Sequence, residues 1–295
     1  NLTSQSDGQI YLYAQWQRNS YAVIYHNNKP NNASDELFGT MQNSVHNYDI
    51  LKNLSPNQFE LLGWSFVGWN TQTDGNGTSF INEQEVKNLS SYDGDEITLF
   101  AQWVPNSYTI QYLSNKPVNA SQPLEGQTVS SLHKYDFIEN LSSNAYSLLG
   151  WKFVGWNTKA DGSGNWYTNA EKVKNITSIN RDSISLYAQW TPNIYYIEYI
   201  DNVPALASGS ISGAMSYSIH TYDTQKTLTA NGYSLPGWKF TAWNTKADGS
   251  GVEYSSSEKI LNITSTDGDI IKLYACWSVN KYKINYHGNK PINAT

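Results

Sequence analysis

The feature that most constrains this chain is an internal repeat with a period of 87 residues. The pentapeptide Leu-Tyr-Ala-Gln-Trp that ends at Trp16 returns, with single substitutions in two copies, ending at Trp103, Trp190 and Trp277, each 87 residues after the one before. The pair Gly63-Trp64 recurs at the same spacing, at 150–151 and 237–238. A fixed period is the signature of a repeat architecture, in which each copy packs mainly against its neighbours.

A cut after the Trp of the pentapeptide divides the sequence into copies. The complete copies are then 17–103, 104–190 and 191–277. Residues 1–16 match the C-terminal part of a preceding copy, and residues 278–295 match the N-terminal part of a following copy. A copy cut in its middle cannot close its core, so we expect the chain to be an excerpt from a longer array.

The tryptophans follow the repeat so closely that a structural role is their simplest interpretation. Ten of the 11 Trp fall on three repeated positions, and only Trp166 does not. We therefore predict that these positions in the complete copies form the core: Trp64, Trp69, Trp103, Trp151, Trp156, Trp190, Trp238, Trp243 and Trp277.

Composition excludes several classes of protein. Charged residues make up only 15% of the chain and the net charge is −6, so no basic stripe is available for nucleic acid. The single cysteine, Cys276, rules out a disulfide within the chain. No apolar run of about 18 residues is present, so we expect no membrane insertion of this segment.

Within the second copy, alternation of polar and apolar residues predicts strands over 107–113, 128–135, 150–158 and 184–190. Residues 160–164 read as a hairpin turn. The third strand is expected to place Trp151, Phe153 and Gly155 on one face, and Val154 and Trp156 on the other.

Two short helical elements are also expected, so the predicted class is β-rich α+β. Asp136 has the spacing of a helix cap with Glu139 three residues later. Residues 170–175 read as a helical turn or a loop. Only four residues, 104–107, separate Trp103 from Tyr108, and Pro105 stiffens them. Adjacent copies should therefore hold a limited range of angles, which predicts an elongated rod.

The motif Gly-Trp-(Ser/Lys)-Phe-x-x-Trp, followed by Asp-Gly-x-Gly and the Leu-Tyr-Ala-Gln-Trp ending, resembles the Listeria–Bacteroides repeat, the B-repeat of internalin-like surface proteins. The resemblance implies an extracellular location at the cell surface and a β-grasp-like fold. Two departures stand out. The family's usual Tyr after the first Gly is Trp here, at Trp64, Trp151 and Trp238, and the period is longer than is typical.

Asn-x-Ser/Thr sequons are the most numerous candidate sites. They occur at Asn1, Asn32, Asn53, Asn76, Asn88, Asn119, Asn140, Asn175, Asn262 and Asn293. Four of them, beginning with Asn1, share one repeat position before the last strand. In a secretory or archaeal setting this shared position predicts N-glycosylation, whereas in an ordinary bacterial setting these residues would be turn residues.

Three other patterns favour structural over chemical roles. The Asp-Gly-x-Gly loops at 74–77, 161–164 and 248–251 offer one carboxylate each and lack the bidentate acid of a calcium site. The His-x-Tyr-Asp motif at 46–49, 133–136 and 220–223 lacks the further ligands of a metal centre and reads as a hydrogen-bonded strand end. Lys29, Lys116 and Lys290 share a repeat position that could form an intramolecular Lys–Asn isopeptide crosslink. The third copy has Val203 at this position, so the crosslink cannot be a general feature.

No catalytic or cofactor-binding constellation is present, so we expect a protein that is not an enzyme. The leading hypothesis is a stalk, spacer or filament-building segment of an adhesin-like surface protein, whose partners are neighbouring copies of the same chain or other copies in a filament. The alternative is a multivalent adhesion module. In that module exposed aromatics such as Tyr13, Tyr187 and Trp166 would bind a host or cell-surface glycan or protein.

Overall fold

The computed structural model describes residues 6–293, which group into two compact units. The first unit contains residues 6–111, 130–142 and 170–184, and so holds the whole first copy with part of the second. The second unit contains residues 112–129, 143–169 and 185–293, and so holds the rest of the second copy with the whole third copy.

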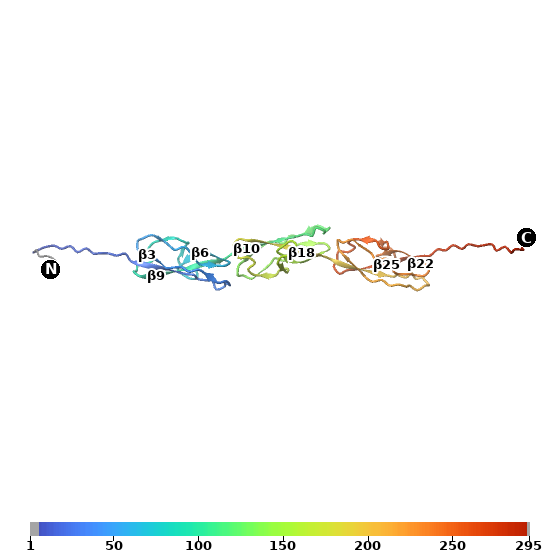
Figure 1. Cartoon of the computed structure of the whole chain (residues 1–295), viewed down its shortest axis with the longest axis horizontal. Coiled ribbons are helices and arrows are strands. Elements are labelled where there is room, and N and C mark those ends of the chain that lie inside the picture. Colours follow the sequence, from blue (N-terminus) through green and yellow to red (C-terminus); the bar gives the residue numbers. More distant parts are fainter. Residues whose placement is uncertain (1–5, 294–295) are drawn as a thin grey trace. The chain divides into compact units, whose positions relative to one another are not determined.

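The first copy is built on a five-stranded sheet with the order β3-β1-β9-β6-β7; β3, β6 and β9 are labelled in the blue and cyan part of Figure 1. Its strands are β1 (Ser20–His26), β3 (Ser44–Asn47), β6 (Trp64–Asn70), β7 (Ser79–Phe80) and β9 (Asp95–Pro105). The first strand β1 and the last strand β9 are parallel neighbours, whereas the other pairs are antiparallel. Two small ladders complete the copy, β2 (Leu37–Phe38) with β5 (Glu60–Leu61) and β4 (Lys52–Asn53) with β8 (Glu85–Val86).

The third copy repeats this plan. Its sheet has the order β20-β19-β25-β22-β23, again with the first and last strands parallel. The strands are β19 (Ile194–Ile200), β20 (Ser218–Thr221), β22 (Trp238–Asn244), β23 (Glu253–Tyr254) and β25 (Ile270–Val279), with a small ladder of β21 (Lys226–Thr227) and β24 (Lys259–Ile260).

The strands of the second copy lie at the same repeat positions. They are β10 (Ser107–Leu113), β11 (Leu124–Glu125), β12 (Ser131–Lys134), β13 (Glu139–Asn140), β14 (Ser147–Leu148), β15 (Trp151–Asn157), β16 (Trp166–Tyr167), β17 (Lys172–Val173) and β18 (Ser183–Pro192). In the first unit β10 pairs with β12 and β13 with β17. In the second unit β11 pairs with β14, and β15 pairs with both β16 and β18.

No helix occurs among residues 6–293, so the class is all-β and the predicted α+β class is wrong. Asp136 does not cap a helix, because it lies in a turn between β12 and β13, with a φ of +64°, and the element that follows it is a strand. The carboxylate of Glu139 instead accepts a hydrogen bond from the backbone N–H of Lys134. The expected helical turn over 170–175 is the short strand β17, between Ala170 and Asn175, which both have positive φ.

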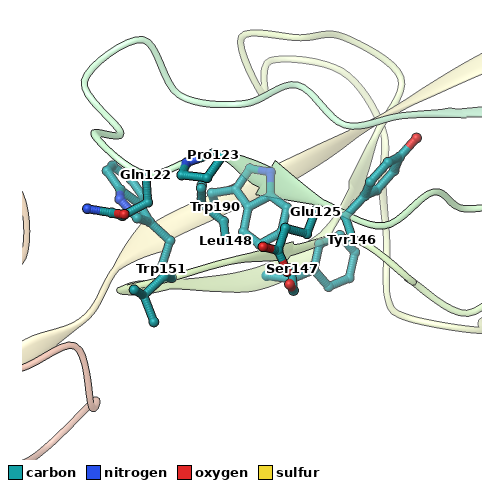
Figure 2. Close-up of a pocket in the computed structure, with 10 residues that line it drawn as sticks. Gln122, Pro123, Glu125, Tyr146, Ser147, Leu148, Trp151 and Trp190 are labelled. Carbon is teal, nitrogen blue, oxygen red and sulfur yellow. The ribbon is translucent and has the colours of Figure 1, made fainter.

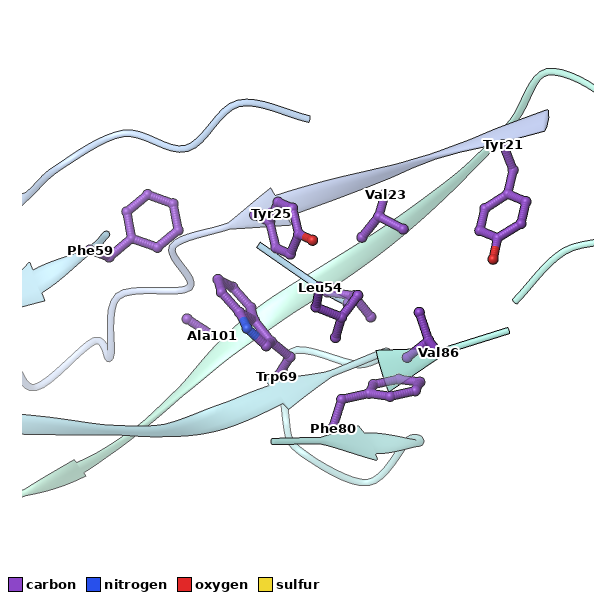
Figure 3. Packing of buried hydrophobic residues seen from close by; sticks show 10 residues of the cluster. Tyr21, Val23, Tyr25, Leu54, Phe59, Trp69, Phe80, Val86 and Ala101 are labelled. Carbon is purple, nitrogen blue, oxygen red and sulfur yellow. The ribbon is translucent and has the colours of Figure 1, made fainter. Parts of the chain in front are cut away.

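Each core is centred on one fully buried tryptophan, as Figure 3 shows for Trp69 in the first copy. The Tyr25 and Phe66 rings lie 4.9 and 5.0 Å from its ring, centroid to centroid. Trp243 has the same arrangement with Tyr199 and Phe240 in the third copy. Tilted and edge-to-face contacts of this kind favour aromatic pairs beyond the area they bury.

A β-bulge corrects the predicted faces of the third strand. Phe153 pairs with Trp190 and Gly155 with Gln189, so Val154 is an extra residue in β15. The bulge shifts the alternation by one residue, and Phe153 and Trp156 consequently point to the same side, with ring centroids 4.9 Å apart. The expectation that Trp156 faces away from Phe153 is therefore wrong.

We predict that Trp156→Ala unfolds the second copy. The side chain is fully buried, and truncating such a residue costs about 3–5 kcal/mol, which is comparable with the stability of a small domain. The matched control is Trp166→Ala, because that side chain in the same copy is 54% exposed. Limited proteolysis should cut Trp156→Ala within residues 104–190 well before wild type and the control; equal rates for the two variants would contradict the assignment of the core.

Candidate functional site: the joint between copies

A single residue, Asn106, separates the last strand of the first copy from the first strand of the second, since β9 ends at Pro105 and β10 begins at Ser107. Asn106 is buried and bonded on both sides. Its backbone N–H donates to Gly63 O of the first copy (2.8 Å), and its carbonyl accepts from the Tyr135 N–H of the second (2.9 Å). The two copies are thus joined by a fixed residue rather than by a linker.

The side chain of Asn106 extends this double attachment. Its Nδ2 donates to Ser178 O (2.7 Å), and its Oδ1 accepts from Ser65 Oγ (2.6 Å). In the second unit Asn193 occupies the same repeat position. Its N–H donates to Gly150 O, its carbonyl accepts from the Tyr222 N–H, and its Nδ2 donates to Ser265 O. Lys152 replaces Ser65 there and forms an ion pair with Asp267 at 2.8 Å.

The second attachment is a buried carboxylate, Asp136, whose side chain is 0% exposed. Two residues of the first copy donate to it. Trp64 Nε1 lies 2.9 Å from its Oδ2, Ser34 N lies 3.0 Å from the same oxygen, and Ser34 Oγ bonds its Oδ1. From the second copy, Asn175 Nδ2 donates to Oδ1 (3.1 Å) and the Lys174 ammonium lies 3.1 Å away.

Burial alone would raise the pKa of Asp136. Hydrogen bonds from Ser34, Trp64 and Asn175 outweigh it and hold the pKa well below its usual range. In the second joint Asp223 accepts from Ser121, Trp151 and Asn262, and its pKa is lowered to about 2 although burial opposes the shift. Both carboxylates therefore carry their charge at any physiological pH.

Apolar packing surrounds each carboxylate. Ala33, Leu61 and Trp64 of the first copy form one buried cluster with Tyr135 of the second. Gly63 makes room for that ring, because a Cβ at this position would lie 2.1 Å from Tyr135 Cδ1. The Tyr135 hydroxyl donates to Asp35 Oδ2 (2.8 Å), and burial first, with Asp35 second, raises the pKa of Tyr135 to about 12.

The second joint has an equivalent cluster of Ala120, Leu148, Trp151 and Tyr222. A glycine, Gly150, again leaves space for the tyrosine ring, because a Cβ at this position would lie 2.2 Å from Tyr222 Cδ1. The His-x-Tyr-Asp motif of each following copy thus supplies a ring and a carboxylate, and the Gly-Trp motif of the preceding copy supplies the space and the donor.

The sequence profile of the Listeria-Bacteroides repeat domain matches residues 21–102 and 108–189, which is more than half of the chain. The chain belongs to the Listeria-Bacteroides repeat family. Its repeats are typical of cell-surface proteins.

Two relatives come from the bacterium Evansella cellulosilytica. One, whose name describes it as a Gly-rich membrane protein, is 27% identical over 228 residues, which are 77% of this chain and 24% of that protein. The other, whose name describes it as a membrane protein, is 26% identical over 277 residues, which are 94% of this chain and 36% of that protein. The chain therefore spans well under two thirds of either relative. Among solved structures, the Bacillus anthracis TIE protein aligns over 88% of this chain and 51% of its own, with 11% identity and a TM-score of 0.27.

No helix among residues 6–293 is long and apolar enough to span a membrane.

The histidine of the His-x-Tyr-Asp motif is buried in each of the three copies. His46 Nε2 lies 2.9 Å from Ser44 Oγ, which in turn contacts the Tyr25 hydroxyl at 3.0 Å, and the ring stacks on Tyr21. His220 has the same environment in the third copy, with Ser218, Tyr199 and Tyr195. Nδ1 of both rings is buried without a hydrogen-bond partner. Each histidine lies in a short strand, β3 or β20, and the Tyr-Asp pair follows that strand, so the motif is a strand end.

The sequons fall into two groups of different exposure. At the shared position, Asn88, Asn175 and Asn262 are half-buried, and the Nδ2 of each donates to an aspartate: Asp49, Asp136 and Asp223, respectively. An N-glycan would occupy that nitrogen. The exposed sequons are Asn32, Asn53, Asn76, Asn119, Asn140 and Asn293, while Asn1 lies outside the described residues. Glycosylation stays a prediction, and the exposed sequons accommodate a glycan more readily.

The remaining candidates are surface features of single copies. Asp161 Oδ1 accepts from the Ser163 N–H within the hairpin turn, and Asn157 Nδ2 donates to Gly162 O and Gly164 O, which closes the loop. The Asp74 and Asp248 turns are equivalent. Lys29, Lys116 and Lys290 are exposed.

One groove lies beside the second joint and is shown in Figure 2. It encloses about 490 Å³ between Gln122, Pro123, Tyr146, Trp151 and Trp190. Trp190 Nε1 donates to Ser114 O and Trp151 Nε1 to Asp223, so both indoles are already used within the fold. Sequence reasoning missed the joint, although the fixed repeat positions of Asn106, Ser34 and Asp136 were its visible signal.

We predict that Asp136→Asn loosens the first joint. The substitution removes the charge that strengthens the bonds from Trp64 and Ser34, and a hydrogen bond to a charged group is worth about 1.5–3 kcal/mol. Asp49→Asn is the matched control, because Asp49 has the same repeat position but, within residues 6–293, bonds to its own copy, at Asn88 and Lys87. Hydrogen exchange at residues 135–136 should speed up in Asp136→Asn, and a similar change in the control at 48–49 would argue against a joint.

We predict that stability falls as the pH drops from about 7 to 5. Burial, first of all, lowers the pKa of His46, His133 and His220. Below the unfolded pKa of about 6.5 the unfolded chain therefore binds more protons than the folded chain, and folding is disfavoured. Lys52 and Lys226 add to this shift in the first and third copies, whereas Glu139, 3.4 Å from His133 Nδ1, opposes it in the second.

The charged residue beside the histidine, Lys52 in the first copy and Glu139 in the second, provides the test. Glu139→Lys should steepen the loss of thermal stability between pH 7 and 5, and Lys52→Glu should reduce it. Melting curves followed copy by copy with hydrogen exchange would show the difference. Identical pH dependence in both variants and wild type would mean that the buried histidines do not govern acid sensitivity.

Proposed function

We propose that the chain is a non-enzymatic spacer segment of a cell-surface or membrane-associated protein, in which copies follow one another at fixed angles and form an elongated rod. The observation that carries this proposal is the one-residue joint. Asn106 and Asn193 each bond the copy before and the copy after, and Asp136 and Asp223 add a second attachment. A spacer needs joints that resist bending, and a joint with two separated attachments does so.

The location rests on the family and on the relatives. Listeria-Bacteroides repeats are typical of cell-surface proteins, and both Evansella relatives are named as membrane proteins. The spacer would hold another part of such a protein away from the membrane or wall. Assembly into filaments and an adhesin role belong to the same proposal, as does glycosylation of the exposed sequons.

A multivalent binding module is the rival proposal. It draws on Trp166, which is 54% exposed, and on Tyr13, which is exposed in the N-terminal segment; Tyr187 is half-buried. Eight of the nine repeated tryptophans in the complete copies favour the spacer instead, because they are committed to the core, to the joints or to the turn after the first strand. The ninth, Trp238, is half-buried, and Trp16 in the N-terminal segment is exposed. Trp166, moreover, has no counterpart in the other copies, which have Ser79 and Glu253 at its position.

We predict a maximum dimension of roughly 100 Å or more for this chain in small-angle scattering, from three copies of about 30 Å each. Asn106→Gly together with Asn193→Gly removes both joint side chains and should broaden the distance distribution without unfolding the copies. A compact globular profile for wild type would overturn the spacer proposal.

A further inference from the structure

The chain enters and leaves each copy through neighbouring strands. In the first copy it enters at β1 and leaves at β9, and these two strands pair in parallel. Tyr21 lies opposite Asp95 at one end of this ladder, and His26 lies opposite Phe100 at the other. The chain therefore enters beside the Tyr21 end, and it leaves beyond the Phe100 end.

Tension on the chain consequently pulls the two strands past each other along their length. The six registered pairs of the ladder share that load, so they must yield together. The same bonds pulled from one end would open one after another, each under the full load. Beyond Phe100, β9 continues beside β6 as far as Pro105, so the outgoing strand is held along its whole length.

Further bonds fasten the incoming strand at its first residues. Ser20 N donates to Asp93 Oδ1 (2.9 Å), Gly94 N donates to Ser20 O (2.7 Å), and Asn19 Nδ2 donates to Ser91 O (2.8 Å). All three tie the start of β1 to the loop just before β9.

The other copies have the same fastening. In the second copy Ser107 N bonds Asn180 Oδ1, and Arg181 N bonds Ser107 O. In the third, Ile194 N bonds Asp267 Oδ1 and Gly268 N bonds Ile194 O, and the parallel ladder of β19 and β25 runs from Tyr196 opposite Ile270 to Ile200 opposite Tyr274.

From this geometry we infer that each copy is a mechanical clamp, which resists tension along the chain by loading its first and last strands in shear. The inference deepens the proposed spacer role, since a segment that holds a surface domain must bear the force that acts on it. The clamp belongs to a single copy and needs no particular angle between copies. A failure of the scattering prediction would therefore leave it standing, and its own failure would leave the spacer standing.

The test pulls one copy in two directions. Both variants are made in the full chain with Cys276→Gln, which restores the residue of the other copies. Arg18→Cys with Val104→Cys attaches handles at the two opposite ends of the ladder. Arg18→Cys with Tyr92→Cys attaches them at the same end. All three positions are exposed, and equal melting temperatures without load show that both variants fold alike.

Single-molecule force spectroscopy then compares the rupture forces. We expect the opposite-end pair to need at least about twice the force of the same-end pair, because forced unfolding follows the unfolding barrier along the pulled direction. The length released, at most about 3.6 Å per residue between the handles, shows that the loaded copy has opened completely. Equal forces in both directions would overturn the clamp. Pulling the Cys276→Gln chain by its termini should give three high-force events, and three low-force events would overturn it equally.

Discussion

A buried carboxylate can keep its charge only if donors surround it, and this constraint organises the array. Asp136 takes its donors from two copies, Trp64 and Ser34 from one and Asn175 from the other. Separation of the copies would leave the charge without the first copy's donors and would expose the Tyr135 ring that packs on Gly63. The copies therefore gain stability from each other, which is the nearest-neighbour coupling expected of repeat proteins.

Much of the fold could be predicted from the sequence, because strands and period are encoded locally. The strands over 107–113, 150–158 and 184–190 correspond closely to β10, β15 and β18. The predicted faces failed at Val154, since a bulge depends on the pairing partner and leaves no mark in the alternation. The predicted helix at Asp136 failed because the spacing to Glu139 fits a helix cap, whereas Asp136 lies in a turn and Glu139 begins the short strand β13. The joint itself pairs residues 72 and 102 positions apart, beyond the reach of any local pattern.

The differences between copies show which contacts the fold requires. The carboxylates and their Trp, Ser and Asn donors are the same in both joints. The residues around these carboxylates and donors differ between the copies. Ser65 in one joint is replaced by Lys152 in the other, and the charge beside the buried histidine is reversed between Lys52 and Glu139. The predicted acid sensitivity therefore differs from copy to copy, whereas the carboxylate and its donors are the same in both joints.

Joint and clamp meet in one residue. Asn106 stands where the last strand of one copy becomes the first strand of the next, so any tension between the copies passes through its backbone. Its N–H is bonded to the loop before β6 and its Nδ2 to the loop before β18, which places a bond on each side of the point of load. A longer linker would stretch before the strands were aligned with the force. With one fixed residue, the outgoing strand of one copy and the incoming strand of the next are loaded together, so the short joint helps each parallel ladder to bear tension in shear.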